Sequence, residues 1–168
     1  EAIAEAAYQR GKIAFSDIRY QEAYMHFQKA ARLSPENPLF TNEVGFLADT
    51  FGDYDKAIAY FEQALASDLK TFGDDHPIVA TRRNNLGFAW SSKGDYDKAI
   101  AYHEQALASG LKTFGDDHPD VAIYRNTLGL AWASKGDYDK AMAYFEQALA
   151  SGLKTLGEDH PKVATYRN

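Results

Sequence analysis

The sequence predicts an all-α protein built from stacked pairs of antiparallel helices. One segment recurs at a constant interval, each copy holds two stretches with helical spacing of apolar residues, and no copy shows the alternation typical of a strand. The string Gly-Asp-Tyr-Asp-Lys-Ala begins at Gly52, Gly94 and Gly136, in steps of 42 residues. Residues 80–121 and 122–163 are identical at 32 of 42 positions. Such regularity indicates similar repeats that pack against their neighbours.

The first helix of a repeat is marked at both of its ends. It is predicted to begin at Pro77, Pro119 and Pro161, because a proline at the first helical position loses no hydrogen bond. Acidic residues just before these prolines suit the positive end of the helix dipole. The helix is predicted to end at Gly94 and Gly136, since glycine readily takes the left-handed cap conformation.

The second helix of a repeat is predicted to run from about Asp95 to Gly115, with apolar residues at steps of three and four. Pro35 ends this helix in the first repeat, whereas the later repeats have leucine at Leu69, Leu111 and Leu153. Without the proline the helix can continue for about one further turn. The predicted repeats are residues 4–37, 38–79, 80–121 and 122–163, with a partial fifth from 164, in one domain spanning 1–168.

The small and bulky residues within each repeat resemble the tetratricopeptide pattern of Leu-Gly, an aromatic residue and two alanines. The matching residues are Leu86, Gly87, Trp90, Ala99 and Ala106, then Leu128, Gly129, Trp132, Ala141, Phe145 and Ala148, and more loosely Gly11, Ala23, Phe27, Ala30 and Pro35. The 42-residue form is similar to repeats of kinesin light chains and of many bacterial tetratricopeptide proteins. The resemblance implies a right-handed α-α superhelix, in which glycines and alanines allow helices to approach and aromatic rings fill the gaps.

The resemblance also implies that a protein or peptide partner lies in a groove lined by the first helices. The residues expected to line it are Lys12, Asn42, Phe46, Thr81, Asn84, Asn85, Phe88, Ser91, Ile123, Asn126 and Leu130. Asn42, Asn84, Asn126 and Asn168 follow one another at 42-residue steps. Because an amide both donates and accepts hydrogen bonds, such a row can hold the backbone of an extended peptide, as similar rows do in kinesin light chains. Alternatively, these asparagines bond to the neighbouring repeat and stabilise stacking.

The basic residues of the first helices also have two interpretations. Arg82, Arg83, Arg125 and Arg167 can form a positive patch for acidic motifs, or pair with the acidic residues of the loops, which we favour. Lys12 with Asn42 gives only a slight indication of a carboxylate clamp like that of chaperone-binding relatives.

No residue pattern indicates catalysis, a metal or a cofactor. His76, His118 and His160 follow acidic residues, but equivalent residues of stacked helices lie ~8–10 Å apart, whereas metal–nitrogen bonds measure ~2 Å. We therefore expect these histidines to cap helices. Nearly every polar residue belongs to a repeating series, whereas catalytic groups are normally unique. We expect the protein not to be an enzyme.

The composition narrows the class of partner. The net charge is -6 with a pI near 5.3, which argues against nucleic acid or an anionic membrane as the main partner. The chain has no cysteine, and no apolar stretch approaches the ~18 residues of a membrane span. It begins at Glu1, so we expect a piece of a longer cytoplasmic adaptor or regulator. The alternative function is a self-assembling scaffold, because exposed terminal repeats favour homo-oligomers.

Overall fold

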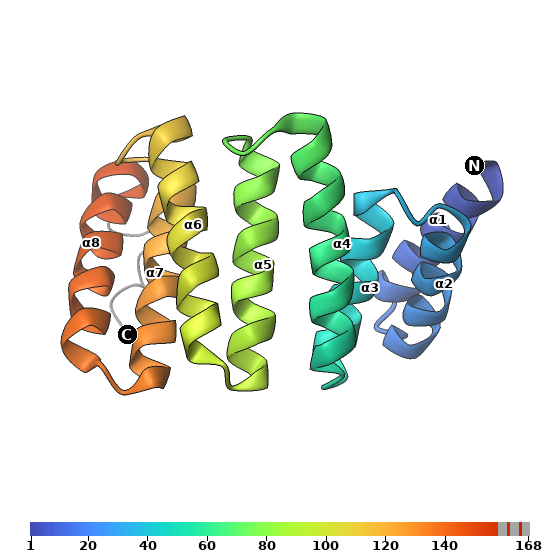
Figure 1. Ribbon diagram of the computed structural model, residues 1–168, viewed down its shortest axis with the longest axis horizontal. Coiled ribbons are helices and arrows are strands. Elements are labelled where there is room, and N and C mark those ends of the chain that lie inside the picture. The colour runs from blue at the N-terminus through green and yellow to red at the C-terminus, as the bar shows by residue number, and fades with distance from the viewer. Residues whose placement is uncertain (158–160, 162–164, 166–168) are drawn as a thin grey trace. The chain divides into compact units, whose positions relative to one another are not determined.

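The computed structural model describes residues 1–157, Pro161 and Thr165, and every regular element in that part of the chain is an α-helix (Figure 1). The all-α class predicted from the sequence is therefore confirmed. The helices are α1 (Ala2–Ser16), α2 (Tyr20–Leu33), α3 (Pro38–Thr50), α4 (Tyr54–Phe72), α5 (Pro77–Lys93), α6 (Tyr96–Phe114), α7 (Pro119–Lys135) and α8 (Tyr138–Leu156).

The chain divides into two compact units. The N-terminal unit, Glu1–Thr71, contains α1 to α3 and all of α4 but its last residue. The C-terminal unit, Phe72–Asn168, contains α5 to α8. Each unit holds two of the predicted repeats, and a single domain over 1–168 stays a prediction.

The ends of the first helices lie where the sequence places them. Both α5 and α7 begin at a proline that follows a histidine N-cap. The Nδ1 atom of His76 accepts a hydrogen bond from the Ile78 amide at 3.2 Å, so the predicted capping role is confirmed there and at His118. Both helices end at a glycine in the left-handed region, with φ of 90° at Gly94 and 93° at Gly136. The third histidine of the series, His160, lies outside the described residues.

The extra residues of the longer repeats lengthen their second helices. Helix α2 ends at Leu33, just before Pro35, after 14 residues. Helices α4, α6 and α8 each have 19 residues. The predicted extension by continued helix is therefore confirmed.

The two helices of a repeat approach closely through a glycine that faces a ring. A Cβ atom added at Gly11 would lie 2.5 Å from the ring of Phe27, closer than carbon atoms can pack. The same contact recurs sixteen residues apart in each later repeat, as Gly45 with Phe61, Gly87 with His103, and Gly129 with Phe145. This contact confirms the expected role of the glycines and explains the small-and-bulky pattern in the sequence.

The turn of the first repeat departs from the pattern of the others. Ile18 has a φ of 62°, in the left-handed region that disfavours a β-branched side chain. The later repeats have Gly52, Gly94 or Gly136 at the equivalent turn, each with a positive φ. This departure accounts for part of the looser fit of the first repeat to the tetratricopeptide pattern.

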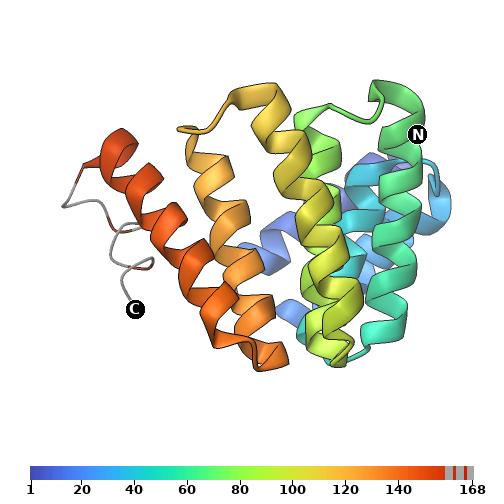
Figure 2. The same cartoon turned by 60° about the vertical axis from the view of Figure 1, so that its left-hand side comes forward.

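In the C-terminal unit, α7 packs against α6 on one side and α8 on the other (Figure 2). The core of this unit includes fully buried small and aliphatic residues of α5, α6 and α7, among them Val79, Leu86, Ala99, Ala106, Val121 and Leu128. Helices α5 and α7 also contact one another. This packing buries the sides of α5 and α7 that face other helices and leaves one face of each helix exposed.

Candidate functional site

The exposed face of α5 and α7 carries most of the residues predicted to line a groove. Thr81, Phe88 and Leu130 are exposed, with 43% exposure for Phe88 and 49% for Leu130. Four others are half-buried at the edges of this face, namely Asn85, Ser91, Ile123 and Asn126. Only Asn84 among the predicted residues of this unit is buried.

The predicted residues of the N-terminal unit lie on α1 and α3. Phe46 is exposed to 49%, and Asn42 is half-buried. Lys12 is exposed, and its Nζ atom lies 5.8 Å from the centre of the Tyr8 ring. Its ammonium group therefore contacts an aromatic face, which is a favourable position for a cation.

Asn84 is the centre of a buried polar cluster, which we call the Asn84 cluster and which comprises Asn84, His103 and Thr127. The Oδ1 atom of Asn84 lies 2.9 Å from Nδ1 of His103 in α6, and it accepts a hydrogen bond of 2.9 Å from the hydroxyl of Thr127 in α7. Exposure is 7% for Asn84, 1% for His103 and 4% for Thr127. This asparagine thus joins three helices, which favours the stacking alternative for Asn84 over peptide binding.

Burial has a large effect on the histidine of the cluster. Desolvation lowers the pKa of His103 from 6.5 to about 4, because the charged imidazolium loses its hydration in the core. The ring is therefore neutral at physiological pH. A neutral ring with its proton on Nδ1 donates to Asn84, and the amide oxygen then accepts from both neighbours.

The two alternatives for the asparagines predict different effects of substitution. Asn84→Ala is expected to destabilise the C-terminal unit by about 2 kcal/mol, because it leaves the buried ring nitrogen of His103 without its partner. The Thr127 hydroxyl loses one acceptor but keeps the Tyr124 carbonyl at 3.0 Å. Asn126→Ala is the matched control, since Asn126 is half-buried and Phe145 takes the place of the histidine beside it. Denaturant unfolding followed by tryptophan fluorescence measures both, because Trp90 and Trp132 are the two tryptophans of the chain. Equal small losses would contradict a stacking role for Asn84.

The sequence pattern alone does not pair Asn84 with His103 and Thr127, because the three residues lie on three different helices. The available signal was His103, a polar residue at a position where the neighbouring repeats have Phe61 and Phe145. Asn168, the last member of the asparagine series, lies outside the described residues.

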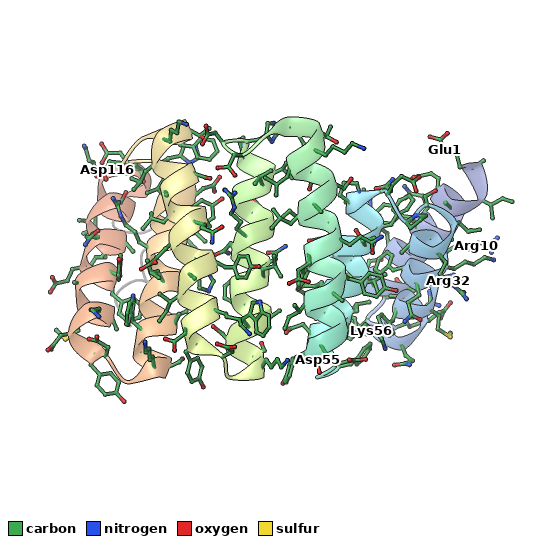
Figure 3. All side chains as sticks on the ribbon, viewed as in Figure 1. Glu1, Arg10, Arg32, Asp55, Lys56 and Asp116 are labelled. Atoms are coloured by element: carbon green, nitrogen blue, oxygen red, sulfur yellow. The ribbon has the colours of Figure 1, made fainter. Side chains whose placement is uncertain are left out.

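Two arginines of the first helices, Arg83 and Arg125, pair with the loops that precede those helices. The guanidinium of Arg125 forms an ion pair with the Asp116 carboxylate and donates to the Asp116 carbonyl at 3.1 Å, at the loop labelled by Asp116 in Figure 3. Arg83 makes the same contacts with Asp74. Both arginines are buried, which supports the favoured interpretation of loop pairing over an acidic-motif patch. Arg167 lies outside the described residues.

The N-terminal unit has further exposed cations besides Lys12. Arg10 of α1 and Arg32 of α2 project outward at the surface in Figure 3. Lys56 at the start of α4 pairs with Asp53 at 2.6 Å. The hydrogen bond from Lys56 lowers the pKa of the Asp53 carboxyl, so this pair remains charged. The Asp53 carboxylate stabilises the N-terminus of α4.

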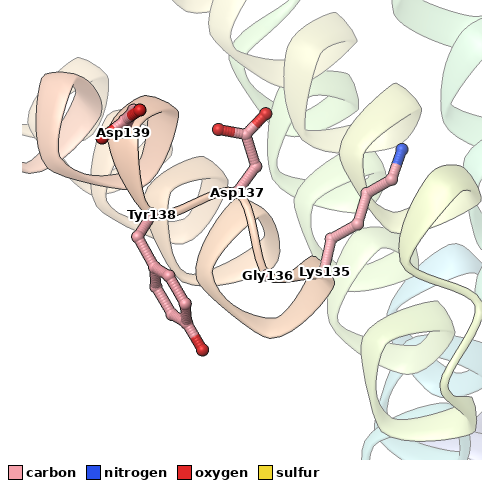
Figure 4. Close-up of a pocket in the computed structure, with 5 residues that line it drawn as sticks. All are labelled: Lys135, Gly136, Asp137, Tyr138 and Asp139. Carbon is pink, nitrogen blue, oxygen red and sulfur yellow. The ribbon is translucent and has the colours of Figure 1, made fainter.

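A shallow pocket lies at the turn between α7 and α8, and its side chains diverge (Figure 4). It is lined by Lys135, Gly136, Asp137, Tyr138 and Asp139. Asp137 accepts from the Lys140 amide at 3.2 Å, and the hydrogen bond from the Lys140 side chain lowers the pKa of this carboxyl. Lys135 pairs with Asp97 of the preceding turn. The charged groups therefore hold the turns together and do not converge on a ligand.

Among the described histidines, His76 and His118 take part in ring stacking and capping. In the described part of the chain, no three His, Cys, Asp or Glu side chains gather as a metal site would require. His76 stacks on Phe72 with ring centres 4.4 Å apart, and His118 stacks on Phe114 at 4.1 Å. Of the helices described, none combines the length and apolar character needed to cross a membrane.

The sequence profile of the tetratricopeptide repeat family matches residues 41–109 and 88–152. The chain belongs to the tetratricopeptide repeat family. Residues 1–35 match the Sel1 repeat, in the part where the tetratricopeptide pattern is loosest. No curated protein matches the chain.

Solved structures with the same fold include other repeat proteins. BtubC (BKLC) from P. vanneervenii is 23% identical, with a TM-score of 0.81 over 98% of this chain and 69% of that one. Kinesin light chain-like TPR-like repeats from Podosopora anserina are 22% identical, with a TM-score of 0.80 over 97% and 81%. MamA from Desulfovibrio magneticus RS-1 is 21% identical, with a TM-score of 0.74 over 91% and 77%. At these identities the likeness shows the fold, and tetratricopeptide repeats are in general protein–protein interaction modules.

Proposed function

We propose that this tetratricopeptide repeat protein binds a segment of another protein on the exposed face of its first helices, as part of a larger adaptor or regulator. The observation that carries the proposal is a large apolar side chain at one equivalent exposed position in three successive repeats. Phe46, Phe88 and Leu130 lie 42 residues apart, and each is 43% to 49% exposed. Single exposed apolar residues are common, but Phe88 and Leu130 lie at this position on two helices of one unit that contact one another, and such neighbouring exposed apolar side chains are typical of an interaction surface.

The surroundings of Phe88 and Leu130 support this proposal. Both lie in the C-terminal unit on helices that contact one another. Their neighbours on this face are hydroxyl, amide and aliphatic side chains, which suit both the backbone and the side chains of a bound segment. Interfaces of this kind depend on a few large apolar anchors.

The proposal is tested with a double variant, Phe88→Ser with Leu130→Ser. Affinity capture from the native source identifies partners by mass spectrometry, and titration of the purified partner then gives Kd for the natural chain and for the variant. We expect Kd to rise at least about tenfold, as for the loss of interface anchors.

The control replaces two large side chains elsewhere in the unit that are more exposed than Phe88 and Leu130. Tyr138→Ser with Met142→Ser on α8 removes side chains that are 68% and 60% exposed, and it is expected to leave Kd unchanged. Equal effects of the two double variants, or none from the first, would argue against the first-helix face. Sedimentation over a range of protein concentrations distinguishes partner binding from the alternative of self-assembly.

A further inference from the structure

The differences between the two repeats of the C-terminal unit gather on one face. Helices α6 and α8 have 19 residues each and differ at three positions, whereas α5 and α7 have 17 residues each and differ at six. Five of the six first-helix differences are spaced by three, four, three and three residues, which places them along one side of the helix. The pairs are Ile78 with Asp120, Thr81 with Ile123, Asn85 with Thr127, Phe88 with Leu130, and Ser91 with Ala133.

Exposure alone does not explain where the repeats differ. The second helices also expose many side chains, and most of those side chains are the same in both repeats, with Met142 as an exception. The exposed and identical pairs are Ala101 with Ala143, Glu104 with Glu146, Gln105 with Gln147, Ala108 with Ala150, and Lys112 with Lys154. Two nearly identical repeats thus keep most of their outer surface, whereas four of the five first-helix pairs that differ are exposed or half-buried in both repeats. This is the distribution expected if that face contacts different chemical groups in each repeat.

The first-helix face carries no exposed charge over most of its length. Between Thr81 and Ser92 the ionisable residues are Arg82 and Arg83, and both are buried. Between Ile123 and Ser134 the sole ionisable groups are those of Tyr124 and Arg125, which are also buried. In a chain with 25% charged residues, a neutral face of this length selects against charged ligands, because their charges would lose hydration without gaining a partner.

The two helices present different chemistry on this face. Helix α5 offers a threonine, a phenylalanine and a serine, whereas α7 offers an isoleucine, a leucine and an alanine at the equivalent positions. Hydroxyl groups can hydrogen-bond to a polar side chain or a backbone, whereas aliphatic groups can only pack. The bond between Asn84 and Thr127 holds the two helices side by side, so the two kinds of surface adjoin.

We propose that the exposed faces of α5 and α7 form a two-part recognition surface for an uncharged protein segment. Aliphatic side chains of that segment pack on α7, and its aromatic and hydrogen-bonding side chains lie on α5. This inference rests on the proposed function, because it names the chemistry of the partner bound at the same face.

The test exchanges the two surfaces without changing their combined composition. One variant carries Thr81→Ile, Phe88→Leu and Ser91→Ala together with Ile123→Thr, Leu130→Phe and Ala133→Ser. Each substituted residue already occurs at the equivalent position of the other repeat, so each is compatible with a first helix. Circular dichroism and tryptophan fluorescence confirm folding before binding is measured.

A phage-displayed library of random peptides is selected on the natural chain, on the exchanged variant and on the Phe88→Ser, Leu130→Ser variant. We expect the natural chain to enrich peptides that lack charge and that carry a cluster of aliphatic residues beside a cluster of aromatic and polar ones. Synthetic copies of these peptides should bind the exchanged variant about tenfold more weakly, and their affinity should change little with salt.

The other outcomes separate this inference from the proposed function. Enrichment of acidic or basic peptides with strongly salt-dependent affinity would overturn the partner chemistry and leave peptide binding at this face intact. If the selected peptides bound the natural and exchanged chains with equal affinity, α5 and α7 would not bind different groups of the peptide. This result would also overturn the inference. If the natural chain enriches no peptide beyond the Phe88→Ser, Leu130→Ser variant, the inference and the proposed function are both contradicted.

Discussion

Gly11→Val is expected to destabilise the N-terminal unit by about 3 kcal/mol, because the added side chain would occupy the space of the Phe27 ring. A Cβ atom at this position would lie 2.5 Å from two ring carbons. Phe27 is 1% exposed and enclosed by other residues, so its ring has no space into which it can move. Hydrogen exchange followed by mass spectrometry measures the effect, since it resolves the protection of individual helices.

Two controls distinguish this clash from a general effect of valine. Ala6→Val adds the same β-branched shape at an exposed position of α1, and a change of about 0.5 kcal/mol is expected. Gly129→Val makes the equivalent contact with Phe145, but that ring is half-buried and can shift, so a smaller loss of about 1 kcal/mol is expected. If Gly11→Val and Ala6→Val had the same effect, the close approach of α1 and α2 would not be what requires glycine.

His103 is expected to make the C-terminal unit sensitive to acid. The pKa of His103 is about 4 in the folded chain and near 6.5 in the unfolded chain, so the unfolded chain binds the proton more tightly. The stability from the neutral ring is therefore complete above pH 6.5 and falls as the pH decreases toward 4. The loss amounts to about 3 kcal/mol across that window.

His103→Phe isolates this effect, because phenylalanine occupies the equivalent position at Phe61 and Phe145 beside the same glycine. The free energy of unfolding, measured by tryptophan fluorescence at a series of pH values, should favour the variant increasingly as the pH falls from 6.5 to 4. His26→Phe on α2 is the control and should leave the pH profile of the C-terminal unit unchanged. A constant difference between the natural chain and His103→Phe over this range would disprove the titration of His103.

Features that depend on nearby residues could be predicted from the sequence. Proline at Pro77 and glycine at Gly94 determine the ends of α5 by local backbone geometry, and the structure places those ends there. The glycine that faces a ring was also predictable in kind, because both residues recur at a constant spacing in the tetratricopeptide pattern. Helical spacing together with the resemblance to tetratricopeptide repeats predicted residues of the first helices that are exposed or half-buried, with Asn84 as the exception in the C-terminal unit.

Features that depend on contacts between repeats could not be predicted. Asn84 lies at the edge of the exposed face on a helical wheel, and only the packing of α6 and α7 decides that its amide is buried. The arginines gave a similar ambiguity, because Arg83 and Arg125 are buried only when the preceding loop folds back to accept their hydrogen bonds. The extent of the neutral face therefore became apparent only in three dimensions.

The Asn84 cluster has a consequence for how the chain folds. Helices α6 and α8 are so similar that α5 could pair with either during folding, and neighbouring repeats with near-identical sequence are prone to such misassembly. With α8 in the place of α6, Phe145 would face Asn84, and a buried hydrogen bond would be lost at a cost of about 1–3 kcal/mol. Correct pairing with α6 instead gives the Asn84 amide its hydrogen-bond partner. This one polar side chain therefore favours the pairing of α5 with α6 over its pairing with the nearly identical α8.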